Sequence, residues 1–513
     1  MKRLAIVLFR YDLRLHDNEL LVWAHANHDY VIHTYCFDPR QITDKTYKCD
    51  LVKCDKYRLK FLIETIEDLN ISLVNRGSDL QTYRDTPENV LGQLVQQFKG
   101  EFEISIGYHQ EATKEETDVE KAIQQLAKDN KLHVKEFWTS TLYHPDDLPY
   151  NNPKAFPDVF TQLRVALEKQ HVQVRRLVNP PNAFKSPPDG LLKTTIPSLL
   201  DFGYTNVTLH SNSVFILKGG ESSGLAHLRS YIWEKNLVHS YKQTRNSLIG
   251  PENTTKFSAW LANGSLSPRQ IFFELKSYES HQGQRDAGYW IIFELLWRDF
   301  FKFIAMKYGA RLFYSRGLRQ EPYAWKHDIK EYEAWRTGNT GIPFVDANMR
   351  EIMATGWMSN RGRQNVASFL TKDLGIDWRY GAVWFESILI DHDVCSNYGN
   401  WIYVAGIGND PRENRHFNMV KQGFDYDPAG VFIRTWCPEL AQLSNEYIQT
   451  PWLAPTHVLA EAGVELGVNY PRPMLVVPQW NQQFKNRRTT TQNQHHTQQR
   501  GINFYFRNHD KRQ

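Results

Sequence analysis

The sequence predicts two unlike domains: an N-terminal α/β domain with a parallel sheet and a large all-α C-terminal domain. Over residues 1–138, short apolar runs rich in β-branched residues alternate with amphipathic segments, the pattern of a Rossmann-like sheet with crossover helices. Residues 216–480 carry helix-period segments instead, and a proline-rich linker at 139–215 separates the two regions. A chain of 513 residues also exceeds what one core usually holds.

Five strands are expected in the α/β domain, each a short apolar run. They lie at Leu4–Phe9, Tyr30–Phe37, Ile71–Asn75, Glu103–Tyr108 and Leu132–Phe137. The helices expected between them are Asp55–Leu69, Pro87–Phe98 and Thr113–Asp129. Ligands of such open sheets bind beyond the carboxyl ends of the strands. No GxGxxG follows a strand, so the nicotinamide-type fingerprint is absent.

The linker and the helical domain are predicted in less detail. One helix is expected in the linker near Asp158–Lys169, and good helical periodicity covers Gly224–Glu234, Ala287–Tyr308 and Pro343–Met353. Residues 481–513 are rich in Gln, Asn, Thr, Arg and His and are expected to form a disordered tail. His495 and His496 in that tail lack further ligands, so no metal site is predicted.

The distribution of charge limits the classes of partner. The formal net charge is +4, but residues 481–513 hold seven Lys and Arg against one Asp, a net of +6 that leaves −2 for the rest. A nucleic-acid surface on the body must therefore be a local patch. The five cysteines form no CxxC pair, which favours a reducing compartment. With no signal, transit or membrane-spanning segment in the sequence, a cytoplasmic, membrane-free protein is expected.

Residues 356–401 hold charged groups within an apolar, Trp-rich segment. The stretch contains Arg361 and Arg363 among amides, then Asp391, Asp393 and Asn397. An unpaired buried charge is too costly to keep. These groups therefore either pair with one another or hold a polar ligand, and a large flat cofactor with apolar and polar edges would suit them.

Two further constellations have both a functional and a structural interpretation. The hydroxyl-rich run at 253–258 precedes a helix-like stretch, which suits a phosphate or an ordinary N-cap box. Glu294, Trp297 and Arg298 share one helix face, where an intrahelical Glu–Arg pair explains two of the three. A carboxyl group beside Trp in an apolar helix should have a raised pKa. The charge-dense loops at 9–18 and 108–111 are expected to cap helices and pair at the surface.

Several motifs, in order and spacing, resemble the photolyase/cryptochrome family over residues 1 to about 480. They are FR-x-DLR-x-x-DN at the N-terminus, Y-x-x-x-R at 241–245, the Thr/Ser run at 254–258, ELLWRDFF at 294–301, WRTGNTGIPFVDANMR at 335–350 and D-x-D-x-x-x-N-x-G-N-W at 391–401. Within the family the chain is most similar to cryptochrome DASH, in MSNRGRQNVASF, DHDVCSNYGNW, YVAGIGNDPRENRHFN and the linker segment DLPYNNPKAFPDVFTQLR.

The resemblance implies FAD bound in the helical domain. Thr254, Thr255 and Ser258 would hold its phosphates, Arg363 and Asp391 would pair across the ring, and Asn397 would face flavin N5. The full implied cofactor set is Tyr241, Thr254, Thr255, Lys256, Phe257, Ser258, Glu294, Arg298, Trp357, Asn360, Arg363, Asp391, Asp393 and Asn397. Trp401, Trp378 and Trp325 match the positions of the family's electron-transfer chain.

The resemblance also implies a deoxyribodipyrimidine photolyase-type lyase that acts on DNA. Under blue light, reduced FAD donates an electron to a cyclobutane pyrimidine dimer, the ring splits and the electron returns. Glu294 and Asn397 would act with the three tryptophans, and DNA would contact Arg245, Trp297, Asn360, Arg361, Gln364, Tyr403 and Arg415. Gln364 and Tyr403 stand where many photolyases have Met and Trp. A smaller stacking face should hold the lesion less strongly, so single-stranded or looped DNA is the expected substrate.

Other implications concern the antenna and a rival function. A 5,10-methenyltetrahydrofolate antenna is expected near Phe37, Gln110 and Glu111, at strand ends of the α/β domain. The same flavin and tryptophans would also serve a blue-light photoreceptor that binds DNA or a protein partner, and this remains the alternative. RNA is a further candidate ligand, and a monomer is expected.

Overall fold

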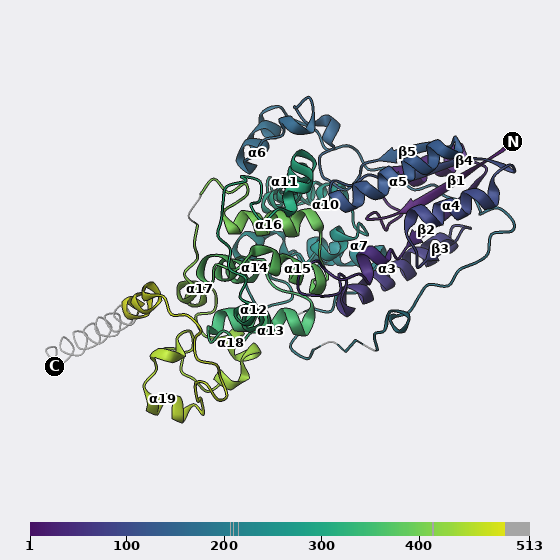
Figure 1. The fold of residues 1–513 in the computed structure, drawn as a ribbon. Coiled ribbons are helices and arrows are strands. Elements are labelled where there is room, and N and C mark those ends of the chain that lie inside the picture. The colour runs from purple at the N-terminus through teal and green to yellow at the C-terminus, as the bar shows by residue number, and fades with distance from the viewer. Residues whose placement is uncertain (206, 209, 214, 413–414, 488–513) are drawn as a thin grey trace. The chain divides into compact units, whose positions relative to one another are not determined.

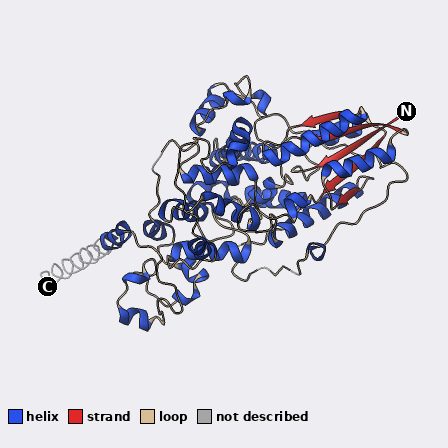
Figure 2. Ribbon diagram, viewed as in Figure 1, coloured by secondary structure: helices blue, strands red, loops and turns tan. Residues whose placement is uncertain are grey.

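The computed structural model describes residues 1–487 except 206, 209, 214 and 413–414. Figure 1 shows the helices and strands of the chain. The chain divides into two compact units. Among the described residues, the first comprises those of 1–324, 352–357 and 377–414, and the second comprises those of 325–351, 358–376 and 415–487. The strands drawn in Figure 2 all belong to the N-terminal part of the first unit.

The N-terminal sheet confirms the predicted α/β fold. Its five strands are β1 (Lys2–Phe9), β2 (Tyr30–Cys36), β3 (Leu80–Tyr83), β4 (Phe102–His109) and β5 (His133–Phe137). They are parallel in the order β3-β2-β1-β4-β5. The strand order therefore reverses between β1 and β4, and their carboxyl ends mark the place where an open α/β sheet binds ligands.

One predicted strand is wrong. Residues 71–75 do not pair in the sheet; they end helix α3 (Lys56–Val74), and β3 follows at Leu80–Tyr83. Leu69 and Leu73 are buried, whereas Ile71 is 59% and Val74 54% exposed. The short β-branched run thus continues the helical period instead of alternating between two buried faces.

Helices cover both faces of the sheet. On one face α1 (Glu19–Asn27) and α3 pack on the side chains of Ala5, Val7 and Phe9. On the other, α4 (Pro87–Phe98) and α5 (Lys114–Asn130) pack on Leu4, Ile6 and Leu8. Both faces of β1 are buried, as its unbroken apolar sequence predicts.

The elements that follow the sheet domain are helices, as predicted. Besides α1, α3, α4 and α5, the helices that lie wholly in the first unit are α2 (Pro39–Ile42), α6 (Phe160–Lys169), α7 (Glu221–Arg229), α8 (Tyr241–Thr244), α9 (Ser258–Ala262), α10 (Pro268–Gln282), α11 (Tyr289–Tyr308), α15 (Trp378–Ile388) and α16 (Val394–Ala405). The others are α12 (Ile329–Arg336), α13 (Pro343–Thr355), α14 (Asn360–Ser368), α17 (Met419–Tyr426), α18 (Val431–Trp436) and α19 (Thr456–Glu461). Residues 478–487 are also helical, so the first part of the predicted disordered tail is ordered. The rest of the tail, with His495 and His496, lies outside the described residues.

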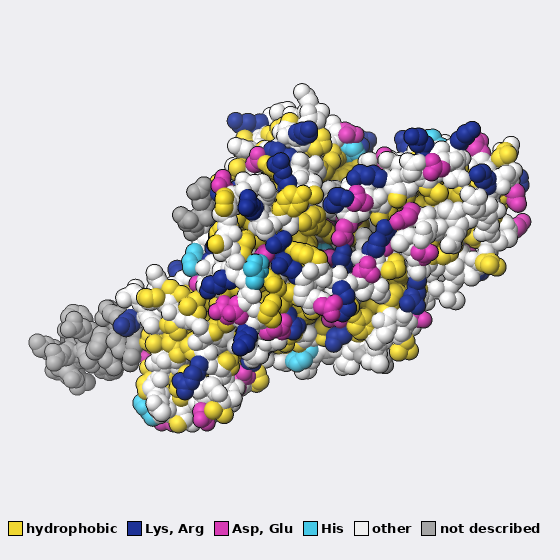
Figure 3. All heavy atoms as spheres, viewed as in Figure 1, with side chains coloured by type: hydrophobic (Ala, Val, Ile, Leu, Met, Phe, Trp, Pro, Cys, Tyr) yellow, Lys and Arg dark blue, Asp and Glu magenta, His cyan; other side chains and the backbone are white. Residues whose placement is uncertain are grey.

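The surface, the helices and the potential metal ligands bear on three expectations. On the face drawn in Figure 3, Lys and Arg side chains are interspersed with Asp and Glu side chains, which agrees with a local rather than a general nucleic-acid surface. Among the described helices none has the length and apolar character needed to cross a bilayer. No cluster of three or more metal-binding side chains occurs in the described part of the chain.

Candidate functional site

The N-terminal motif FRYDLRLHDN connects the α/β domain to the helical region that starts at α7. Arg14 Nη1 donates to the carbonyl of Gly264 at 2.7 Å, and the Asp17 carboxylate forms a buried ion pair with Arg269 of α10 at 2.8 Å. The Glu221 carboxylate accepts from the main-chain N–H of Leu15 at 2.7 Å. These contacts are buried and join parts of the chain that are far apart in sequence. The expectation of surface pairing and local capping at this motif is therefore wrong.

The hydroxyl-rich run at 253–258 presents groups that suit a phosphate. Helix α9 begins at Ser258 without a side-chain cap, so the run does not form an ordinary N-cap box. The Thr254 hydroxyl is buried and finds no hydrogen-bond partner within the described chain. The Lys256 Nζ lies 4.9 Å from the centre of the Trp357 ring. A buried hydroxyl without a partner is costly, and an anionic ligand would satisfy it.

The start of helix α16 supplies polar groups of the predicted flavin site. Asp391 accepts from the Ser258 hydroxyl at 2.7 Å, and Asp393 caps α16 by accepting from the Ser396 N–H at 2.7 Å. Burial acts to raise the pKa of Asp393, but Lys302 and Arg298 hold it below its ordinary value. A fixed carboxylate at this position can accept hydrogen bonds from a ligand.

The orientation of the Asn397 amide follows from one bond. Its Nδ2 donates to the carbonyl of Ala382 on α15 at 3.0 Å. Since a carbonyl can only accept, the nitrogen must point at Ala382, and the oxygen is turned away from it. Asn397 is only 9% exposed. Contacts between the two helices, and not water, therefore hold the amide in place.

Two of the three predicted electron-carrying tryptophans lie together in the first unit. Trp378 begins α15, is fully buried and donates its indole N–H to the carbonyl of Ser315 at 3.2 Å. One turn later, Gly381 lies so close to the Trp401 ring that an added Cβ would collide with it. The Trp401 ring therefore packs against α15 at Gly381, three residues after Trp378 in the same helix. Trp325 belongs to the second unit.

The predicted residues at 360–364 begin helix α14 in the second unit. Asn360 is exposed at its first turn. Arg361 Nη1 donates to Gln364 Oε1 at 3.0 Å, and its guanidinium lies 4.7 Å from the Tyr426 ring centre. Arg363 Nε donates to the Met358 carbonyl at 2.9 Å. These bonds orient both guanidinium groups within the unit.

Arg415, also in the second unit, stacks on an aromatic ring. Its guanidinium carbon lies 4.8 Å from the centre of the Phe417 ring. Such a contact holds the planar guanidinium group in one orientation. The residue is partly exposed, so the group remains open to solvent.

Two residues predicted to contact the lesion, Trp297 of α11 and Tyr403 of α16, are in contact. The rings of Trp297 and Tyr403 meet edge to face, with centroids 5.7 Å apart and an interplanar angle of 86°. On the same face of α11, Glu294 pairs with Arg245, whose guanidinium lies 4.7 Å from the Trp290 ring centre. Burial raises the pKa of Glu294, and Arg245 opposes that rise.

The predicted intrahelical pair of Glu294 with Arg298 does not form. Arg298 Nη2 donates to the carbonyl of Leu261 at 3.0 Å, and Nη1 donates to the carbonyl of Ser140. Arg298 therefore connects α11 to the linker.

Two further members of the predicted cofactor set, Tyr241 and Phe257, are buried in the hydrophobic core that also contains Leu295 of α11.

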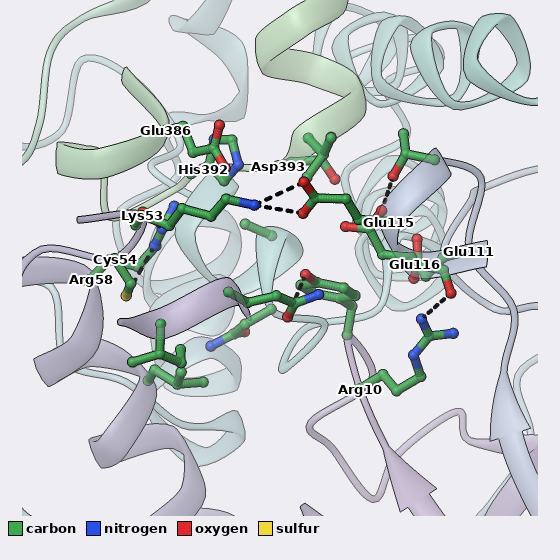
Figure 4. Close-up of a pocket in the computed structure, with 18 of the residues that line it drawn as sticks. Arg10, Lys53, Cys54, Arg58, Glu111, Glu115, Glu116, Glu386, His392 and Asp393 are labelled. Carbon is green, nitrogen blue, oxygen red and sulfur yellow. Dashed lines mark hydrogen bonds and ion pairs between the residues drawn. The ribbon is translucent and has the colours of Figure 1, made fainter. Parts of the chain in front are cut away.

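A charged cavity of about 110 Å³ lies beyond the carboxyl ends of β1 and β4 (Figure 4). Arg10 and Tyr11, which follow β1, and Glu111 and Thr113, which follow β4, line it together with residues of α3, α11, α15 and the start of α16. The sheet's switch point thus holds a cavity, as expected for this topology.

Ion pairs surround the cavity. They join Arg10 to Glu120 at 2.6 Å, Lys302 to Glu111 at 2.6 Å and Lys53 to Glu115 at 2.7 Å. In Figure 4, Lys53 contacts Glu115 close to His392 and Asp393. Because both side chains of the Lys302–Glu111 pair are nearly inaccessible, either partner alone would be a costly buried charge.

Several groups that line the cavity remain available to a ligand. Burial raises the pKa of Glu116 to about 7 despite a hydrogen bond from Thr113. Burial lowers the pKa of His392 well below its ordinary value, and Arg58 lowers it further. Arg58 Nη1 and His392 Nδ1 have no hydrogen-bond partner within the described chain. A ligand that offers both acceptors and donors would satisfy this lining.

Of the three predicted antenna residues, only Glu111 lines this cavity. Phe37 is buried between Tyr35 and Phe202 in the sheet's core. Gln110 Nε2 donates to Glu136 Oε2 at 3.1 Å instead. Arg10, which also lines the cavity, belongs to the charge-dense loop noted in the sequence. The cavity's other basic and imidazole groups escaped sequence reasoning, and they are Lys53, Arg58, Lys302 and His392.

Two family models match the chain. One, described as DNA photolyase, matches residues 5–184, and the other, the FAD binding domain of DNA photolyase, matches residues 290–490. The match to the second model supports FAD as the cofactor. Together with the fold, the two models define a photolyase-type flavoprotein.

Relatives that match nearly the whole chain show which family within this class it belongs to. A cryptochrome DASH from Xenopus laevis is 50% identical over 523 residues and covers 99% of each chain. Among solved structures, a Synechocystis cryptochrome has a TM-score of 0.89 at 44% identity, covering 95% of this chain and 100% of that one. A class III photolyase from Agrobacterium tumefaciens has a TM-score of 0.80 at 28% identity, covering 96% and 98%. The chain belongs to the cryptochrome DASH family.

Proposed function

We propose that this protein uses blue light and reduced FAD to repair cyclobutane pyrimidine dimers in DNA, with a preference for single-stranded or looped lesions. The observation that carries the proposal is the edge-to-face contact of Trp297 with Tyr403 at 5.7 Å, beside Glu294 on the same helix face. Two aromatic rings next to a carboxyl group whose pKa is raised by burial suit an extruded pair of pyrimidines.

The side chains around this contact have separate tasks in the proposed reaction. Trp297 and Tyr403 offer apolar ring surface to the dimer. Glu294, whose pKa is raised by burial, is the group that would donate a hydrogen bond to a base carbonyl. Arg245 stacks on Trp290 while paired with Glu294, and a DNA phosphate would compete for its guanidinium.

FAD, when bound, supplies light absorption and the transferred electron. The chain's own groups fit its phosphates and its flavin ring. The buried Thr254 hydroxyl and the Lys256 ammonium suit the phosphates, and the fixed amide of Asn397 offers hydrogen bonds but no acidic proton. An amide at that position favours keeping a reduced, anionic ring unprotonated. Trp378 and Trp401 would carry electrons to the ring from the protein.

We further propose that the cavity beside β1 and β4 takes a folate antenna such as 5,10-methenyltetrahydrofolate. A pterin ring offers N–H donors for the Glu111 and Glu116 carboxyl groups, and the glutamate tail offers carboxylates for Lys53 and Arg58. All four residues line the cavity, and Arg58 Nη1 lacks a partner within the described chain. Asp393 also lines it, so the antenna would lie near a residue of the predicted flavin set.

Illuminating the reduced protein with dimer-containing oligonucleotides tests the proposal. We expect light-dependent loss of dimers in a single strand, slower loss in a duplex, and none in the dark. A single-stranded RNA with the same lesion shows whether the sugar matters. Failure to repair any substrate would instead favour the photoreceptor, which uses the same flavin and tryptophans.

A further inference from the structure

The linker between the sheet and the helical region contacts the proposed lesion pocket directly. Phe160, the first residue of helix α6, stacks on Trp297 with ring centroids 3.8 Å apart and an interplanar angle of 4°. Phe160 is 5% exposed. One face of the Trp297 indole is therefore covered by a residue that comes from outside the helical domain.

The linker is held in place at this point by several hydrogen bonds. They run from Lys307 Nζ to the Phe156 carbonyl at 2.7 Å, from the Tyr308 hydroxyl to Asp158 Oδ1 at 2.6 Å, and from Asn409 Nδ2 to the Asp158 carbonyl at 2.8 Å. Lys307 and Tyr308 end α11, the helix that carries Trp297. The stacked ring of Phe160 is thus fixed relative to that helix.

Other rings restrict Trp297 from the side. Phe300 meets it at 5.7 Å and 90° and Tyr403 at 5.7 Å and 86°, both edge to face, while Phe301 meets it at 5.7 Å and 31°. Edge-to-face contacts leave much of a ring face free, whereas the parallel stack with Phe160 covers one face. Since the indole is packed among these aromatic neighbours, its rotation would require Phe160 to move.

We propose that Phe160 is a positioning residue for lesion recognition. By covering one face of Trp297 it fixes the indole, so that a flipped pyrimidine dimer meets only the remaining surface beside Tyr403. This inference rests on the proposed repair function. It makes a linker residue, far from the predicted site motifs in sequence, a determinant of how well damaged and undamaged strands are distinguished.

The test compares Phe160→Leu, Phe160→Tyr and Phe293→Leu in the full-length protein. Leucine keeps much of the volume but removes the ring, while tyrosine keeps the stack. Phe293 meets Phe160 edge to face at 5.0 Å, and its substitution controls for loss of a neighbouring ring. Thermal unfolding checks that each variant folds.

The first readout needs no DNA. In protein labelled with 5-fluorotryptophan, the Trp297 resonance is identified by its loss in Trp297→Phe. We expect this resonance to shift and broaden in Phe160→Leu, and to stay near its original position in Phe160→Tyr and Phe293→Leu. An unchanged resonance in Phe160→Leu would overturn the stacking on which the inference depends.

The second readout is binding in the dark to single strands with and without a dimer. For Phe160→Leu we expect roughly three- to tenfold weaker binding of the damaged strand, the range of one aromatic pair, with binding of the undamaged strand unchanged. The tyrosine variant should restore the preference. At saturating substrate, dimers split per absorbed photon should match the wild type.

The outcomes separate this inference from the proposed function. A wild-type preference for the damaged strand that survives in Phe160→Leu would overturn only the role of Phe160. A wild-type protein without that preference would overturn repair as the function, and the role of Phe160 with it.

Discussion

The side-chain nitrogen of Asn397 donates to the carbonyl of Ala382 at 3.0 Å, which joins α16 to α15 and fixes the direction of the amide. Replacing Asn397 by Asp substitutes an acceptor for this donor. The new carboxyl group can face the Ala382 carbonyl only when it is protonated, so folding should raise its pKa. Its folded form would then bind more protons than the unfolded chain.

The expected consequence is a pH-dependent loss of stability in Asn397→Asp. Relative to wild type, its free energy of unfolding should fall as pH rises from the unfolded Asp value toward the raised folded value. Chemical denaturation at several pH values measures this difference. An Asn397→Ala variant, which lacks an ionisable group, should lose about 1 kcal/mol at every pH. Equal pH profiles for Asp and Ala would contradict this account of the amide.

The buried pair of Asp17 and Arg269 predicts a large coupling energy. Arg269→Met leaves the Asp17 carboxylate buried without its cation, and should lower the free energy of unfolding by roughly 3–5 kcal/mol. The double variant Asp17→Asn, Arg269→Met should cost clearly less than the two single variants together. Simple additivity would mean that the pair does not hold the N-terminal motif to α10.

A chain of buried histidine bonds predicts loss of stability in acid. The Lys185 N–H donates to His25 Nδ1 at 3.0 Å, so His25 must carry its proton on Nε2, which faces His33 Nε2 at 3.1 Å. His33 then donates from Nδ1 toward Ser78 at 3.2 Å. Both rings are thereby held neutral, and burial lowers the pKa of His25 to about 4.

Because the folded pKa of His25 lies below its unfolded value, the unfolded chain binds more protons between these values. Stability should therefore fall as pH drops from about 6.5 to about 4, by about 3 kcal/mol for this group at most. His25→Phe keeps a ring against Phe184, which stacks on His25 at 4.1 Å, and should show a shallower acid slope. Denaturation at about pH 7 and about pH 5 compares them, and identical slopes would contradict the prediction.

The cavity predicts which residues control antenna binding. Glu111→Gln removes a charge that faces both the cavity and Lys302, and should weaken folate binding at least tenfold, as loss of a charge-assisted hydrogen bond does. Gln110→Ala should bind folate like wild type, since Gln110 does not line the cavity. Titration of the purified protein with the folate, followed by its absorbance, measures both. Equal losses in the two variants would place the antenna elsewhere.

The sequence predicted the sheet well because β1 and β4 are continuous apolar runs with no competing pattern. It failed at Ile71–Asn75, where a short run with β-branched residues also fits the last turn of α3. The helical spacing of the buried residues Ile66, Leu69 and Leu73 could have decided the case. A short apolar run cannot be assigned to a helix or a strand until the residues on either side of it are considered.

The candidate site, too, could be predicted from the sequence only in part. Residues in contiguous motifs, such as Glu294 and Trp297, could be predicted to share one helix face from their spacing, and their role from the resemblance of the motif. The cavity's Lys53, Arg58 and His392 were not, because they come from separate elements and share no periodic pattern. Lys302 did carry a signal, as a charge within the apolar helix ELLWRDFFKF, where an unpaired ammonium group would be too costly.

The central claim is tested most directly by counting dimers in a single-stranded oligonucleotide before and after blue light, with the reduced wild-type protein and with Trp297→Ala. The account predicts steady, light-dependent dimer loss with wild type, none in the dark, and a rate at least tenfold lower with Trp297→Ala at subsaturating substrate, as expected when a stacking face is removed. Dimers that persist under light with the reduced, FAD-loaded wild type would contradict it.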